Sequence, residues 1–535
     1  MYAMKKKPFS KFLILLPMAV ALSGCNVYSM IFGSNDPFAS IGGGGAFYST
    51  AKVGEETHDD ALINYKPSTE GVYTPDSVLP YGYRDLNWTS NADIVPSTGD
   101  VKLLVLPIEL SGYQFKSNIK NDLSLALQGN SINGSTGYWE SLASYYEKAS
   151  FGKLRLSFEI ADIYDCGYTP EQAYKLGNNA IPIVSAAVNN YKKQAGVDLQ
   201  SLDSDSNGLI DGVIAIYSCP DFQKSTKIAK FDTDQFFWAY CYWDVEGGTP
   251  NRISPNMNVY FWASYDFLYN QYNQIDAHTL IHEFGHMLGL DDYYPNSESD
   301  KAFFPTGWLD MMDGNILDHN CYSKSALGWT IPKVVDGSAE VEISASYNTG
   351  DCILIPSSHW NGSIWSEYIL LELYSPLGLN LQDSRTAYEG RPQGFTEPGV
   401  KIYHVDSRVV SGYATAASKS PTYAFHNSTT LHPVDTSTQF RFYRVGPSNC
   451  FKDEAICPTA YSLIHLMEAN KKFTFATGNY ATNSSLFHAG SKFTLSDFSA
   501  FFPRKTTLND GSSFPYEIEV QSVGLESAKI KITKA

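Results

Sequence analysis

The chain has 535 residues, of which 43% are hydrophobic and 14% aromatic, and its formal net charge at pH 7 is −17. A chain of this length can bury large cores in two or three domains. Its acidic character argues against electrostatic binding to nucleic acid or to anionic lipid.

The first 24 residues predict a bacterial lipoprotein signal peptide. Lysines at 5–7 precede an apolar run at 12–22, which is too short to span a bilayer comfortably. The sequence Leu-Ser-Gly-Cys follows at 22–25 and resembles a lipobox, so we expect Cys25 to carry a lipid that anchors the protein at the bacterial cell surface. A plain secretory signal with an incidental cysteine is the alternative. Loss of residues 1–24, which hold four lysines and no acidic residue, changes the formal charge to −21.

Residues 25–97 are rich in Gly, Ser, Thr, Pro and Asn and include four consecutive glycines at 42–45. This composition predicts a flexible tether in the first part of the segment. The later part contains Tyr81, Tyr83 and Trp88. Either it packs on the following domain or it is a propeptide, and the sequence leaves both open.

Residues 98–334 mix strand patterns with helical patterns, which predicts an α+β domain. The run at 101–110 is apolar almost throughout and predicts a buried strand. We expect one helix to begin near Asp276, whose side chain suits an N-cap. The other expected elements are helices at 138–148 and 170–195, and strands that begin at Lys153, Gly212 and Asn258.

Residues 203–211 have the oxygen-ligand spacing of a calcium-binding loop. Gly208 occupies the sixth position, where such loops bend sharply. Position 12 is Ile214 instead of a bidentate glutamate, and a strand pattern follows where a helix is usual, so a solvated acidic turn is the alternative. We expect any calcium here to have a structural role. The expected ligands are Asp203, Asp205, Asn207, Leu209 through its carbonyl oxygen, and Asp211.

The segment 282–292 reads HEFGHMLGLDD and is the most informative part of the sequence. His282 and His286 are four residues apart, so on a helix both imidazoles lie on one face and can reach one zinc ion. Glu283 is the expected general base for a metal-activated water. The alternative is a chance match on an amphipathic helix, but the pattern is rare in a chain with 11 histidines.

A catalytic zinc needs a third protein ligand and one open position. Gly289 can adopt the backbone conformation that ends a helix and reverses the chain. Asp292 then lies where the extended pattern HExxHxxGxx(His/Asp) has its third ligand, and the adjacent Asp291 is its rival. Tyr293 and Tyr294 follow and could donate to an oxyanion, although packing is the commoner role for a tyrosine beside a helix end.

Two methionines, Met311 and Met312, follow about twenty residues later in the segment GWLDMMDGN. A methionine turn beneath the metal ligands is typical of metzincins, and we assign Met312 to this floor. Filling of the core is the general role of methionine and agrees with that assignment. His319 is a candidate contact to the substrate or transition state, with an ordinary surface or loop histidine as the alternative.

Short alternating segments separated by turn residues at 335–535 predict a β-rich, sandwich-like second domain.

Seven cysteines remain beside Cys25, so they cannot all pair within the chain. Cys450 with Cys457 is the favoured disulfide, and Cys219 with Cys241 is a weaker candidate. None of the cysteines has zinc-finger spacing, so we do not expect them to bind metal.

The segment HEFGHMLGLDDYY is similar to the motif of the immune inhibitor A-like secreted bacterial metallopeptidases, which often reads HExGHxLGLPDYY. This resemblance implies a zincin-like or metzincin-like catalytic domain with Asp292 as the third zinc ligand. Asp291 stands where the family has proline, so Asp291 stays open as a ligand. The other segments that resemble the family lie between 101 and 406, at 145–157, 203–217, 307–315, 323–329, 367–372 and 399–406.

The resemblance implies an extracellular endopeptidase that acts on proteins or peptides. Together with the lipobox, it predicts a lipid-anchored zinc metalloendopeptidase. Two alternatives stay open: a surface adhesin or glycan-binding protein with a vestigial zincin domain, and a zinc hydrolase of cell-wall peptides. The intact Glu283 argues against the first, because a vestigial site has little reason to keep its general base.

Overall fold

The computed structural model describes residues 93–116, 118–129, 139–244, 247–294, 303–360, 362, 364–408 and 462–535. Outside these ranges it gives the backbone of five short strands: β1 (Gly71–Tyr73), β13 (Val410–Tyr413), β14 (Thr422–Phe425), β15 (His432–Pro433) and β16 (Arg441–Arg444). The expected signal peptide, Cys25, Cys450 and Cys457 lie outside the described residues. No helix within the described ranges is long and apolar enough to cross a membrane.

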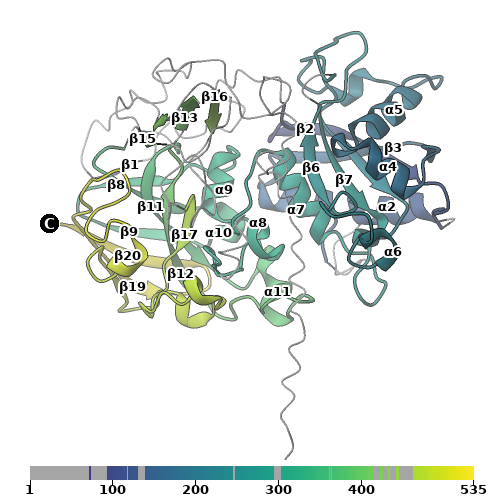
Figure 1. Cartoon of the computed structure of the whole chain (residues 1–535). Helices are drawn as coiled ribbons and strands as arrows, with labels where there is room; N and C mark the ends of the chain where they lie inside the picture. Colours follow the sequence, from purple (N-terminus) through teal and green to yellow (C-terminus); the bar gives the residue numbers. More distant parts are fainter. Residues whose placement is uncertain are drawn as a thin grey trace, which may run out of the picture.

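Two parts lie side by side, an N-terminal part in blue and teal and a C-terminal part in green and yellow (Figure 1). The N-terminal part holds a mixed sheet in the order β3-β2-β5-β7-β6, with β4 beside β2. All its pairs are parallel except β6 with β7, so β6 is an antiparallel edge strand. The strands are β2 (Gly99–Glu109), β3 (Leu154–Ile160), β4 (Tyr164–Asp165), β5 (Val213–Tyr217), β6 (Tyr240–Trp243) and β7 (Val259–Ser264).

Strands β5 and β7 are apolar apart from Ser264, because both faces of each strand are covered. Every residue of β5 and β7 is buried. Helix α7 packs against β6 and β7, and α3 packs against both α7 and β3. The longer helices of this part are α2 (Ile119–Gln128), α3 (Leu142–Ala149), α4 (Pro170–Leu176), α5 (Ile181–Tyr191) and α7 (His278–Met287).

Two details of the expected helices are wrong. The helix expected at 170–195 is divided into α4 and α5, because Gly177, Asn179 and Ala180 have positive φ angles of 61°, 47° and 63° that no continuous right-handed helix contains. Helix α7 has Ala277 at its N-cap position and not Asp276. The Asp276 carboxylate instead accepts hydrogen bonds from the backbone N–H and the Nδ1 atom of His278, at 2.9 Å and 2.6 Å.

The C-terminal part is rich in strands and contains a six-stranded sheet, β1-β8-β10-β11-β12-β17, and a four-stranded sheet, β18-β19-β20-β9. The chain that leads from the N-terminal sheet to β8 forms two short helices, α8 (Met311–Gly314) and α9 (Cys321–Ala326), and the short helices of the C-terminal part are α10 (Ser346–Thr349) and α11 (Leu381–Arg385). The strands not yet given are β8 (Lys333–Asp336), β9 (Ala339–Ser344), β10 (Cys352–Pro356), β11 (Glu367–Tyr374), β12 (Gly399–Asp406), β17 (Ile464–Leu466), β18 (Lys492–Phe493), β19 (Tyr516–Val523) and β20 (Ser527–Lys534).

The six-stranded sheet lies between two hydrophobic cores. On β11, Tyr368 and Leu370 belong to the core that also fills the N-terminal part, whereas Ile369 and Leu371 belong to a second core shared with β19 and β20. Successive side chains of a strand point to opposite faces, so burial of both faces makes all eight residues of β11 buried. Strand β20 of the four-stranded sheet alternates buried with accessible positions because only one of its faces is covered.

The chain is integrated into the N-terminal part from residue 93. The backbone N–H of Val95 donates to Met287 at the end of α7, and the indole of Trp329 donates to the carbonyl of Ser97. Strand β1 pairs with β8 at the edge of the six-stranded sheet. Parts of the segment expected to be a tether or propeptide therefore contact both parts of the molecule.

The weaker disulfide prediction, Cys219 with Cys241, is wrong. Neither residue is in a disulfide bond. Cys219 follows β5 and Cys241 lies on β6, and β7 runs between these two strands. Two strand spacings of about 4.8 Å each separate the positions, which is beyond the reach of a disulfide.

Candidate metal centre

Helix α7 presents two histidines from its buried interior. All ten residues of α7 are buried, and His282 and His286 are one helical turn apart. Their Nε2 atoms are 3.2 Å from each other. The two imidazoles therefore converge on one point beside the helix, as the HExxH spacing predicts.

The end of α7 reverses the chain toward these histidines. Gly289 has a φ of 99°, and its N–H donates to the carbonyl of His286 while the N–H of Leu290 donates to that of Gly285. This pair of hydrogen bonds is a Schellman motif, which favours glycine at the left-handed position. The turn carries the next residues back over the helix face.

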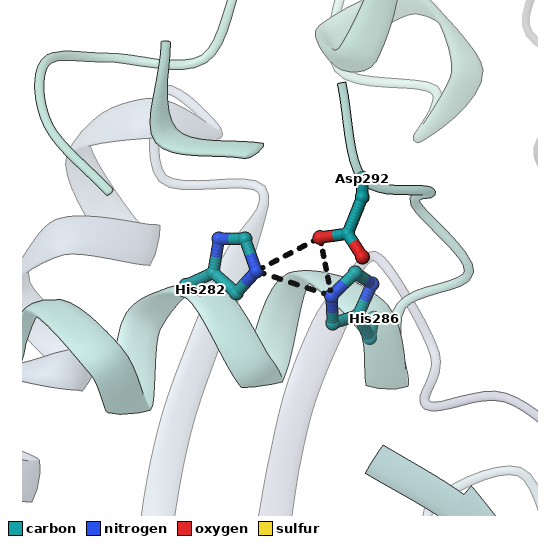
Figure 2. Close-up of side chains that lie close together, drawn as sticks. All are labelled: His282, His286 and Asp292. Atoms are coloured by element: carbon teal, nitrogen blue, oxygen red, sulfur yellow. Dashed lines mark hydrogen bonds and ion pairs between the residues drawn. The ribbon is translucent and has the colours of Figure 1, made fainter. Parts of the chain in front are cut away.

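Asp292 lies directly against both histidines (Figure 2). Its Oδ1 atom is 3.1 Å from Nε2 of His282 and 3.2 Å from Nε2 of His286. The three side chains form a group that could hold one metal ion. Asp291 is only half-buried and does not belong to this group. Of the two aspartates considered as a third ligand, the structure thus brings Asp292 to the histidines.

Two backbone carbonyls orient the imidazoles. The Nδ1 atom of His282 is 2.9 Å from the carbonyl oxygen of Met311, and Nδ1 of His286 is 2.8 Å from that of Leu290. A carbonyl only accepts, so each Nδ1 carries the proton and each Nε2 has a lone pair free for a metal. These carbonyls could not be found from the sequence, because any residue type can supply one.

The charges of the cluster favour a cation at its centre. Burial alone would raise the pKa of Asp292, but His286 and His282 hold it below its usual value. Burial alone would lower the pKa of His286, but Asp292 raises it to about 9. Without a metal, the cluster therefore retains a proton at neutral pH, between the His286 nitrogen and the Asp292 oxygen. A bound cation would take the place of that proton.

Glu283 follows the first histidine and is completely buried. Its charge acts on His286 and on the thiol of Cys241 in the edge strand β6. Glu283 is therefore close to the group of His282, His286 and Asp292 and to the strand at the border of the sheet. This is the neighbourhood that a general base for metal-assisted hydrolysis needs.

Met312 packs against α7, the helix that carries the two histidines. A Cβ atom added to Gly285 would lie 2.5 Å from the sulfur of Met312, so the absence of a side chain at 285 makes room for the thioether. The carbonyl of Met312 accepts from Tyr293, and its N–H donates to Asp310, the N-cap of α8. The predicted methionine turn thus contacts α7 and the segment that carries Asp292.

The other polar side chains near the motif pack inside the protein. The Tyr293 hydroxyl is buried and 2.7 Å from Oγ of Ser323. The Tyr294 ring lies parallel to that of His282, with centroids 6.3 Å apart. His319 is 3% exposed, and burial, followed by the charge of Lys324, holds its pKa well below the usual value. The geometry around His319 is that of a neutral core histidine.

The predicted calcium loop also brings acidic groups together. Asp203, Asp205 and Asp211 each offer a carboxylate oxygen, and these oxygens lie within 4.8 Å of one another. Gly208 has a φ of 91°, as expected at the bend. Asn207 donates its side-chain amide to Asp205 and to Asp93, and its own Oδ1 accepts from the N–H of Leu209. The structure therefore gathers the three aspartates, while the Asn207 side chain is engaged within the loop and with Asp93.

Asp310 and Asn320 were not singled out from the sequence, yet they hold the methionine turn. Asn320 donates to Asp310 through its backbone N–H and its side-chain amide, at 3.2 Å and 2.8 Å. Their one sequence signal is that Asp and Asn are favoured N-cap residues, and each caps a short helix, α8 and α9.

Comparisons of the chain with protein-family models and with curated proteins gave no match.

Proposed function

We propose that this protein is a zinc-dependent endopeptidase that acts outside the cytoplasm and is anchored by a lipid on Cys25. The observation that carries the proposal is the convergence of His282, His286 and Asp292, with ligand atoms 3.1–3.2 Å apart, next to the buried Glu283. Protein or peptide substrates and the lipid anchor come from the sequence motifs and from the family resemblance.

The donor set suits zinc. Ligands about 2.1 Å from a tetrahedral zinc are about 3.4 Å from one another, close to the separations in this cluster. Two imidazoles and one carboxylate make up three protein ligands, and a catalytic zinc keeps its fourth position open. The buried carbonyls that fix both histidine tautomers give the outer shell that such sites need.

When bound, zinc polarises the scissile carbonyl and lowers the pKa of water. Glu283 would take a proton from the attacking water and deliver it to the leaving amine. The burial of Glu283 favours this shuttle, because a carboxylate removed from bulk water binds a proton more readily. Met312 would keep α7 and the Asp292 segment at a fixed separation through its packing and its carbonyl.

A metzincin-like fold is part of the proposal. It is supported by the mixed sheet with an antiparallel edge strand next to the metal-binding helix, and by the methionine turn below that helix. For the C-terminal part we propose a β-sandwich, supported by the core shared between its two sheets.

We also propose calcium as a structural ion in the loop at 203–211. Three carboxylates with oxygens within 4.8 Å of one another repel, and a divalent cation would remove that repulsion. Calcium content and a calcium-dependent rise in the unfolding temperature are the measurements that check this part.

Replacement of the general base tests the proposed chemistry. Glu283→Gln should lower casein hydrolysis by about 10²–10⁴-fold, because glutamine cannot take up the proton, while zinc content stays unchanged. Glu171→Gln is the matched control, since Glu171 lies on α4 with a largely exposed side chain and should retain full activity. Hydrolysis by Glu283→Gln at the wild-type rate would contradict the mechanism. A zinc chelator should stop the wild-type enzyme.

A further inference from the structure

Two buried cysteines meet where the N-terminal part joins the six-stranded sheet. Cys321 is the first residue of α9 and Cys352 is the first residue of β10. Neither side chain has any solvent exposure, and both are free thiols in this structure. They are 31 positions apart in the chain, so a bond between them would close a substantial loop.

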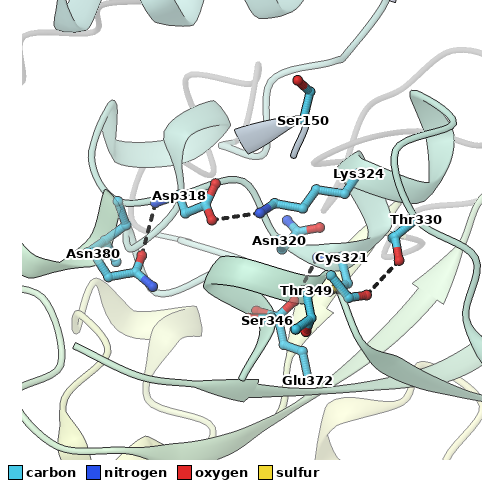
Figure 3. Close-up of polar contacts among 12 residues, drawn as sticks. Ser150, Asp318, Asn320, Cys321, Lys324, Thr330, Ser346, Thr349, Glu372 and Asn380 are labelled. Atoms are coloured by element: carbon cyan, nitrogen blue, oxygen red, sulfur yellow. Dashed lines mark hydrogen bonds and ion pairs between the residues drawn. The ribbon is translucent and has the colours of Figure 1, made fainter. Parts of the chain in front are cut away.

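Glu372 fixes the relative position of the two cysteines. Its Oε2 atom accepts a 2.6 Å hydrogen bond from the backbone N–H of Cys321 (Figure 3). Cys352 is the residue directly opposite Glu372 in the antiparallel pairing of β10 with β11. One side chain therefore ties the start of α9 to the position beside Cys352.

The two side chains interact in one buried cluster. The sulfur of Cys321 is 3.7 Å from the carbonyl oxygen of Gly350, two residues before Cys352, and Cys321 and Cys352 belong to the same hydrophobic core. On the other side, the Thr330 hydroxyl donates to the same Gly350 carbonyl. Both cysteines are fully buried in this junction, which leaves no room for bulk water between them.

We propose that Cys321 and Cys352 form a disulfide bond in the mature protein. Each thiol loses its hydrogen as the S–S bond forms, and the two electrons and two protons reduce a second disulfide, such as oxidised glutathione, to two thiols. The bond closes during folding, because the finished junction excludes an oxidant. The inference rests on the extracytoplasmic location in the proposed function, since disulfides persist in such compartments.

This bond would attach the methionine turn to the C-terminal sheet. Asn320, the N-cap of α9, donates to Asp310, and Asp310 holds the N–H of Met312. A covalent link one residue after Asn320 therefore restrains the floor of the metal centre. It would act as a structural staple and takes no part in catalysis.

Peptide mapping of the full-length chain tests the proposal directly. The protein is unfolded, refolded in a buffer of reduced and oxidised glutathione, alkylated in denaturant without reduction, digested and examined by mass spectrometry. We expect a linked pair of peptides that contain Cys321 and Cys352, lighter by two hydrogen atoms than the two reduced peptides. Recovery of both cysteines in alkylated form, or linked to other cysteines, would overturn the proposal.

Thermal unfolding supplies a second readout that does not use activity. The oxidised wild-type protein is reduced with dithiothreitol under denaturing conditions that open the bond, and is then refolded with the reductant present. Its Tm should be about 5 °C lower than before reduction. The variant Cys321→Ser/Cys352→Ser should show no such loss, whereas Cys219→Ser, which replaces a buried free thiol after β5, should lose as much as the wild type. An equal loss in the double variant would contradict the assignment. Failure of the peptidase proposal would leave both readouts unchanged, so the two failures can be distinguished.

Discussion

The identity of the proposed third metal ligand depends on one position in the chain. Asp292 touches both histidines, whereas Asp291 is half-buried and outside the cluster. The reason is the length of the turn after α7: the Schellman motif uses Gly289 and Leu290 to reverse the chain, and the second residue after it reaches the helix face. The sequence contained this signal, because glycine at 289 predicts the turn and the spacing predicts residue 292.

A histidine outside the His282–His286–Asp292 group gives a pH dependence of stability. His465 on β17 packs among Phe303, Phe473 and Phe501, with ring centroids 5.3–5.6 Å away, and its Nε2 finds no hydrogen-bond partner among the described residues. Burial lowers the pKa of His465 from 6.5 to about 3. Between these values the unfolded chain binds a proton that the folded chain does not, so the native state loses stability as pH falls through this window.

We therefore expect His465→Phe to reduce acid destabilisation. Between pH 7 and pH 4, the variant should lose on the order of 3 kcal/mol less unfolding free energy than the wild type, measured by urea denaturation at each pH. His488→Phe is the control, because the His488 side chain is 41% exposed. Identical pH profiles for His465→Phe and the wild type would rule out a neutral buried His465.

At the scale of elements, the methionine turn packs against α7 at a glycine, which has no side chain. Gly285 lies between the two histidines in sequence, and the Met312 sulfur occupies the space where its side chain would be. The Tyr146 hydroxyl also lies only 3.3 Å from that position and donates to the carbonyl of Ile281 in the same helix. Close packing of this kind tolerates little added volume.

Gly285→Ala should lower stability by about 1–3 kcal/mol, because the added methyl group overpacks the contact with Met312. It should also weaken zinc binding, since α7 and the turn carrying Met311 together position His282. Gly524→Ala is the matched control, because a Cβ there meets nothing nearer than 3.4 Å. Thermal unfolding and competitive zinc titration measure both effects. A variant as stable as Gly524→Ala, with unchanged zinc affinity, would contradict this packing role.

Long apolar elements could be predicted from the sequence, whereas interruptions and edge positions could not. The runs at 103–108, 213–217 and 259–263, which lie in β2, β5 and β7, are apolar throughout, and buried parallel strands need that composition. The division of the helix at 170–195 depends on positive φ angles at Asn179 and Ala180, which their residue types do not specify. Strand β6 is only four residues long and lies within the aromatic run at 236–243, where no turn residue marks the start of the strand.

At the scale of the molecule, the two parts share one continuous core. Tyr368, Leu370 and Tyr403 of the C-terminal sheet belong to the same hydrophobic cluster as the residues of α7. Side chains of the C-terminal part also accept hydrogen bonds from the backbone after the methionine turn: Asp383 from Leu317, Asn380 from Asp318 (Figure 3) and Glu372 from Cys321. The sequence predicted a change of character near residue 335, but this interlocking comes from contacts between distant segments and has no local signal.

A chain that ends at residue 334 should therefore not fold as an independent peptidase. It would expose the shared core and leave the N–H groups of Leu317, Asp318 and Cys321 without their acceptors. We expect loss of near-UV circular dichroism and of a cooperative thermal transition, with the full-length chain as reference. A soluble fragment with one sharp transition and bound zinc would show that the N-terminal part is autonomous.

The central claim is that His282, His286 and Asp292 hold a catalytic zinc, and metal analysis of two neighbouring variants tests it most directly. The wild type and Asp291→Ala should each contain one zinc per chain after dialysis. Asp292→Ala should bind zinc at least about 100-fold more weakly, because it lacks the carboxylate that meets both histidines. Equal zinc content in all three proteins, or loss of zinc from Asp291→Ala alone, would contradict the account.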